Sequence, residues 1–151
     1  MKMQRRRATP QLDSLLAELV LVMKDQFDKL WSGVKYQELS VQKLKVAEEF
    51  LKPIIDKINA SPVVLKICDG GCGDGVHACV LAEKTNKNFD YLGLDISEPA
   101  ITASRSRLAG DSRFRFDVAD ISEHDCATEF DIVFSYGVIA YTESPKDTVE
   151  N

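Results

Sequence analysis

Residues 63–75 constrain the fold of this 151-residue chain more than any other segment. They read Val-Val-Leu-Lys-Ile-Cys-Asp-Gly-Gly-Cys-Gly-Asp-Gly, an apolar run followed by a glycine-rich turn, and a helical pattern starts directly afterwards at Val76. Glycines let a backbone approach a ligand where a side chain would collide, and a helix that begins there directs its N-terminal amides at that ligand. The order of strand, turn and helix therefore predicts a cofactor-binding turn.

Three more strands are expected downstream, over residues 89–96, 113–118 and 130–135. Helical or loop segments separate all four strands, which is typical of a parallel sheet wound by helices. The second strand ends in Asp95, a helix's length beyond the glycine turn. A carboxylate in that place is positioned to accept hydrogen bonds from both hydroxyls of a ribose.

The chain ahead of the sheet predicts two helices. The first starts at Thr9-Pro10 and repeats apolar residues at helical spacing up to Trp31. The second begins at Ser40 and runs to Asn59, and Pro53 is expected to kink or break it. We expect these helices, within residues 1–61, to pack on the sheet or on each other.

Four motifs in order resemble those of class I S-adenosylmethionine (SAM)-dependent methyltransferases. Residues 69–75 resemble the D-x-G-C-G-x-G signature, residues 94–101 the second motif, residues 118–121 the segment with the adenine-contacting acid, and residues 130–139 the fourth-strand motif. The resemblance implies an α/β fold with a Rossmann-like parallel sheet. This chain would supply the N-terminal half of the seven-strand sheet, whose order is 3-2-1-4-5-7-6, preceded by the two helices.

The resemblance also implies SAM as the cofactor and suggests where each part of it binds. The glycine turn would face the methionine end, whose carboxylate suits the positive N-terminus of the helix at Val76. Asp69 and loop carbonyls would meet the ammonium and the sulfonium. Ser135, at the end of the fourth strand, would lie near the methionine and the methyl acceptor.

The adenosine would lie against the second and third strands. In the family's pattern Asp95 binds the ribose hydroxyls and Ile96 packs on the adenine. Asp120 accepts from the adenine amino group, and the backbone N–H of Ile121 lies near a ring nitrogen. The complete set of candidate cofactor residues is Asp69, Gly71, Cys72, Gly73, Gly75, Asp95, Ile96, Asp120, Ile121 and Ser135.

Methyl transfer requires little further chemistry from the protein, because the sulfonium is already a strong electrophile and positioning supplies much of the rate. His77 is expected to pack in the first turn of its helix, so no catalytic residue is assigned. The segment Ser135-Tyr136-Gly137-Val138 lacks the Pro-Pro motif of amino-methylating DNA enzymes, and the net charge is −5. The charge argues against a broad nucleic-acid footprint. The continuation over residues 137–141 resembles the group of these enzymes that acts on small metabolites, lipids or quinones, which implies a small-molecule acceptor, with protein and tRNA acceptors left open.

Two other functions remain open. Gly73-x-Gly75-x-x-Ala78 allows the looser form of the dinucleotide motif, with Asp95 suitably spaced, which would indicate an NAD(P)-dependent oxidoreductase. That interpretation gives no role to Asp120. Alternatively the chain is a SAM-binding module that is catalytically incomplete.

The cofactor domain is expected over residues 62–151 and to be truncated at its C-terminus, because four strands are found where the family has seven. The fourth strand would then be an open apolar edge, which the rest of a longer protein or a second chain would cover.

The four cysteines lack C-x-x-C spacing. A zinc site from Cys72, His77 and Cys79 would occupy the glycine turn, so no metal is expected. Reduced thiols and the lack of a signal peptide or membrane-spanning run predict a cytoplasmic protein.

Overall fold

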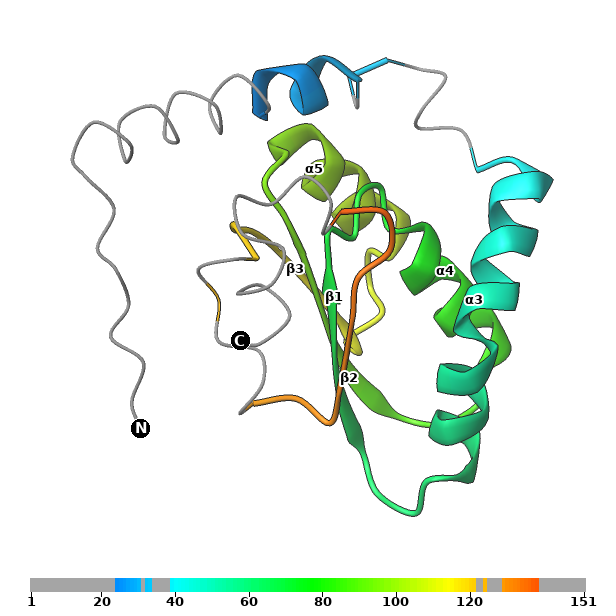
Figure 1. Ribbon diagram of the computed structural model, residues 1–151. Helices are drawn as coiled ribbons and strands as arrows, with labels where there is room; N and C mark the ends of the chain where they lie inside the picture. The colour runs from blue at the N-terminus through cyan, green and yellow to red at the C-terminus, as the bar shows by residue number, and fades with distance from the viewer. Residues whose placement is uncertain (1–23, 31, 34–38, 122–123, 125–128, 139–151) are drawn as a thin grey trace, which may run out of the picture.

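The computed structural model describes residues 24–30, 32–33, 39–121, 124 and 129–138. Its elements run in the order α3 (Val41–Ala60), β1 (Leu65–Gly70), α4 (Val76–Lys84), β2 (Phe89–Asp95), α5 (Glu98–Arg107), β3 (Phe114–Val118) and β4 (Ile132–Phe134). The strands form one parallel sheet in the order β3-β2-β1-β4 (Figure 1). This confirms the expected α/β class and the expected order of the four strands.

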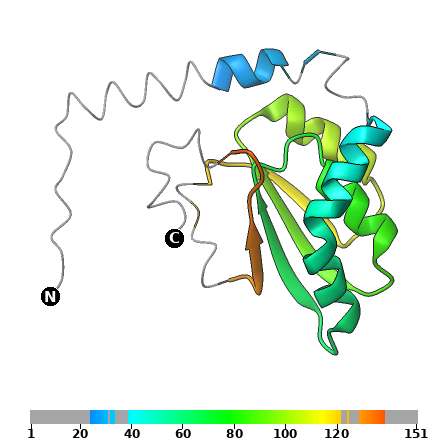
Figure 2. The ribbon, with the colours of Figure 1, turned by 45° about the vertical axis from the view of Figure 1, so that its right-hand side comes forward.

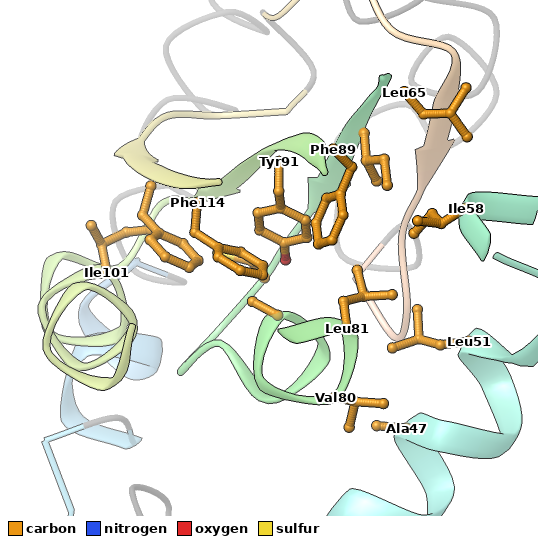
Figure 3. Packing of buried hydrophobic residues seen from close by; sticks show 14 residues of the cluster. Ala47, Leu51, Ile58, Leu65, Val80, Leu81, Phe89, Tyr91, Ile101 and Phe114 are labelled. Atoms are coloured by element: carbon orange, nitrogen blue, oxygen red, sulfur yellow. The ribbon is translucent and has the colours of Figure 1, made fainter. Parts of the chain in front are cut away.

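Helices α3, α4 and α5 lie on one face of the sheet (Figure 2). Leu51 of α3, Leu81 of α4 and Ile101 of α5 are fully buried in one apolar cluster. That cluster also holds Tyr91 of β2 and Phe114 of β3 (Figure 3). Because side chains alternate along a strand, Tyr91 faces the helices whereas its neighbour Leu92 belongs to a smaller cluster on the opposite face.

Helix α3 begins where the sequence predicts. Ser40 is its N-cap, and the Ser40 hydroxyl accepts a hydrogen bond from the backbone N–H of Lys43 at 3.2 Å. Of the kink or break expected at Pro53, the break does not occur, because α3 runs without interruption from Val41 to Ala60. The kink stays a prediction. Pro53 lies on the exposed side of the helix, where water can bind the carbonyl that its missing N–H leaves unpaired.

The first expected helix is described only in part. Residues 24–30 are helical, as expected, and the remainder up to residue 23 lies outside the described residues. In the part of the chain that the structure describes, no helix is both long and apolar enough to cross a membrane.

Strand β4 is shorter than expected and forms one edge of the described sheet. The regular ladder covers Ile132–Phe134, and Asp131 continues it with its backbone N–H bonded to the Lys66 carbonyl at 2.9 Å. Val133 is 51% exposed on this edge. The pairing of this edge with further chain or with a second chain stays a prediction.

Candidate cofactor-binding site

The glycine turn passes over the end of β2. The backbone N–H groups of Gly71 and Cys72 both donate to the Leu94 carbonyl, at 2.7 and 2.9 Å. Gly71, Gly73 and Gly75 have φ angles of 81°, 54° and 79°, a region that residues with a Cβ avoid. Glycine is therefore required by the path of the turn itself, as well as by any ligand that approaches it.

Asp95 ties the turn to the end of β2. Its Oδ2 accepts from the backbone N–H of Gly73, and its Oδ1 accepts from that of Ser97, both at 2.9 Å. Each carboxylate oxygen keeps a second lone pair that can accept from a ligand. Burial raises the pKa of the Asp95 carboxyl, and these two hydrogen bonds oppose that effect.

The glycine turn, Asp95 and Asp120 line one cavity of about 480 Å³ at the carboxyl ends of the strands. Seven of the ten predicted residues line it, namely Gly71, Cys72, Gly73, Asp95, Ile96, Asp120 and Ile121. Open parallel sheets bind ligands at this end of their strands. The convergence of Asp95 and Asp120 on the glycine turn is the geometry that an adenosine site requires.

The other three predicted residues do not line this cavity. Gly75 is the N-cap of α4, and Asp69 is completely buried behind the turn. Ser135 is half-buried, and its hydroxyl has no hydrogen-bond partner among the described residues. Its neighbour Tyr136 faces the cavity instead. The cofactor roles of these three residues stay predictions.

Asp69 forms a buried network with β2 and α4. Its Oδ2 accepts from the Tyr91 hydroxyl at 2.5 Å and lies 3.1 Å from Nδ1 of His77. Burial raises the pKa of Tyr91 well above its usual value, so the hydroxyl stays protonated and donates. His77 is buried, as its expected packing role requires, but it also lines the cavity.

Several cavity residues have no motif that would reveal them. Lys43 and Val46 come from the first turns of α3, Phe27 from the helical segment 24–30, and Val138 from the chain after β4. Only the tertiary fold brings them to the glycine turn.

Gly93 is a separate case, because its sequence pattern indicates its role. A glycine inside a strand often marks a close backbone approach. A Cβ there would lie 2.7 Å from Phe116 and 2.9 Å from the Cys72 sulfur.

The described residues hold no cluster of three or more His, Cys, Asp or Glu side chains that could bind a metal ion. The zinc alternative therefore gains no support. Burial raises the pKa of the Cys72 thiol well above its usual value.

Comparisons with known proteins agree with this geometry. Residues 63–151 match the family model described as "Methyltransferase domain". No curated protein sequence matches the chain. The fold is similar to that of magnesium protoporphyrin IX methyltransferase from Synechocystis PCC 6803, crystallised with SAM (TM-score 0.63, 20% identity, 85% of this chain and 67% of that one).

Two further structures extend the likeness. One is a SAM-dependent methyltransferase from Methanococcus maripaludis, given as putative in its own description (TM-score 0.55, 15% identity, 99% of this chain and 60% of that one). The other comes from a complex between the Haloferax volcanii Trm112 methyltransferase activator and a protein that its own description also gives as a putative methyltransferase (TM-score 0.56, 21% identity, 82% of this chain and 52% of that one). The chain thus spans between about half and two thirds of the length of these proteins.

Proposed function

Because the chain belongs to the class I SAM-dependent methyltransferase family, we propose that it binds SAM in the described cavity and transfers a methyl group to a small-molecule acceptor. The observation that carries this proposal is the single hollow shared by the glycine turn, Asp95 and Asp120. The family resemblance stated from the sequence is confirmed.

The residues of the cavity fit the chemistry of SAM. The cofactor is cationic at its sulfonium and ammonium. Among the described residues, Asp95 and Asp120 line the cavity with one cation, Lys43, and a third acid, Asp74, is paired with Arg107 at 3.1 Å. The backbone of the turn carries no side chain at Gly71 and Gly73, so a ligand can lie directly against it. When bound, SAM supplies a methyl group that is already activated towards nucleophiles.

In this proposal each residue has a specific task. Asp95, whose oxygens are oriented by the two backbone N–H groups, accepts from the ribose hydroxyls. Ile96 packs on the adenine. Asp120 accepts a hydrogen bond from the adenine amino group, and the backbone N–H of Ile121 donates to a ring nitrogen. Such preorganised contacts fix the cofactor, and orientation of the acceptor then contributes much of the rate.

The rest of the cavity supports an acceptor with apolar surface. Phe27, Val46, Tyr136 and Val138 contribute apolar surface to its lining. Apolar walls with few polar groups are typical of small-molecule sites. The matches described above include no oxidoreductase, so the NAD(P) alternative has no support among them.

Replacing Asp95 with alanine is expected to weaken binding of SAM and of S-adenosylhomocysteine (SAH) by about a hundredfold, because charge-assisted hydrogen bonds to the ribose are lost. Isothermal titration calorimetry measures this effect. Asp90→Ala is the matched control, since Asp90 is an exposed acid on the same strand, and it should leave the affinity unchanged. Binding of NAD by the unaltered protein, without binding of SAM or SAH, would contradict the proposal.

SAH binding is also expected to weaken on acidification, at a higher pH than protonation of a carboxyl with an ordinary pKa would produce. Burial raises the pKa of Asp95 above its usual 3.8, so the carboxylate takes up a proton at a higher pH and loses accepting capacity as the pH falls. Titrations between pH 7 and pH 4 compare the unaltered protein with Asp95→Ala. The variant should show a flatter dependence, and parallel curves would rule out Asp95 as the group responsible.

A further inference from the structure

A neutral imidazole has two tautomers, and the neighbours of His77 favour one of them. Nδ1 of His77 faces Asp69 Oδ2, an oxygen that already accepts from Tyr91. An unprotonated Nδ1 would place its lone pair against this carboxylate, so Nδ1 carries the proton and donates. In the neutral imidazole the other nitrogen, Nε2, is then a hydrogen-bond acceptor.

Nε2 of His77 is exposed to the cavity. His77 lines the cavity, and within the described residues Nε2 has no hydrogen-bond partner and is not among the fully buried polar atoms. The rings of Phe50, Phe134 and Tyr136 surround His77, with centroids 5.6–5.7 Å from its own. These contacts and the bond to Asp69 fix the orientation of the imidazole.

We infer that Nε2 of His77 accepts a hydrogen bond from the α-ammonium of SAM. This inference rests on the proposed function. His77 is the second residue of α4, whose N-terminal amides favour the cofactor's carboxylate. The ammonium sits on the same carbon as that carboxylate, so it lies close to the start of α4 and needs an acceptor. Asp69 Oδ1, buried and without a partner among the described residues, adds negative potential behind the imidazole.

His77→Phe tests the contact, because it keeps a ring among the aromatic neighbours and removes both nitrogens. Calorimetry is carried out with four ligands: SAH, decarboxylated SAH (which keeps the amine), deaminated SAH (which keeps the carboxylate) and 5′-methylthioadenosine (which has neither group). We expect affinity for SAH and decarboxylated SAH to fall by about tenfold to a hundredfold. Affinity for deaminated SAH and methylthioadenosine should stay within about twofold.

A measurement on the unaltered protein makes the test independent of whether the variant folds. The chain has only two histidines, so the Nε2 resonance of His77 is readily assigned by nitrogen NMR. It should shift with SAH and with decarboxylated SAH, and not with deaminated SAH.

The inference is overturned by equal weakening of all four ligands, by a response that follows the carboxylate rather than the amine, or by an unchanged affinity for SAH. The proposed function fails separately, if the unaltered protein binds no SAH. If SAH binds and His77→Phe leaves its affinity unchanged, only the role of His77 is lost.

Discussion

Gly71→Ala is expected to destabilise the fold by about 2–5 kcal/mol and to abolish SAH binding. Gly71 has a φ of 81°, and a non-glycine residue in that region costs about 1–2 kcal/mol. A Cβ there would also lie 2.8 Å from the Cβ of Val138, and overpacking of this kind costs about 1–3 kcal/mol. The turn would have to move away from Val138, and the cavity wall formed by both residues would move with it. Urea unfolding measures the stability, and calorimetry measures the affinity.

Gly110→Ala separates the two causes. Gly110 also has a positive φ, of 92°, but a Cβ there would meet nothing within 4 Å. Gly110→Ala should therefore lower the free energy of unfolding by about 1–2 kcal/mol and leave SAH binding unchanged. Adding Val138→Gly to Gly71→Ala should recover part of the lost stability, because it removes the collision. Equal losses of stability for the two alanine variants, or no recovery in the double variant, would show that the Cβ added at residue 71 does not collide with Val138.

The sequence was sufficient to predict what depends on local pattern. Apolar runs separated by helical segments predicted four parallel strands. Asp95 and Asp120 line one cavity because residues that follow parallel strands meet at one edge of the sheet, and their roles towards a cofactor stay predictions. The glycine turn was recognisable because its positive φ angles restrict the residue type. The N-cap of α3 was recognisable for a similar reason, since Ser40 supplies the hydroxyl that the first helical turn lacks.

What escaped prediction depends on contacts between distant segments. Nothing near Lys43 or Val138 in the sequence indicates that both reach the glycine turn. Pro53 does not break α3, because the penalty for proline depends on whether water can bind the carbonyl that loses its N–H partner, and only the fold shows that this helix face is exposed. His77 was interpreted correctly as a packed residue. Its hydrogen bond to Asp69 and its place in the cavity wall could not be predicted, because both depend on how α4 packs against β1.

Asp69 is a second position at which a substitution is expected to destabilise the fold strongly. Asp69→Ala leaves the Tyr91 hydroxyl and the His77 Nδ1–H buried without their shared acceptor. An unsatisfied buried donor costs about 1–3 kcal/mol, so the loss expected for the two donors is about 2–6 kcal/mol in urea unfolding. Such a loss is a large part of the stability of an ordinary domain.

Tyr91→Phe provides the matched test of this network. Alone it should cost about 1.5–3 kcal/mol, because Asp69 loses a donor to its charged oxygen. Made in the Asp69→Ala background, the same change should instead restore some stability, since it removes a hydroxyl that no longer has a partner. A double-mutant cycle therefore predicts strong non-additivity. Losses that simply add would mean that Tyr91 and Asp69 stabilise the sheet independently, and that the carboxylate is not the acceptor that holds β1, β2 and α4 together.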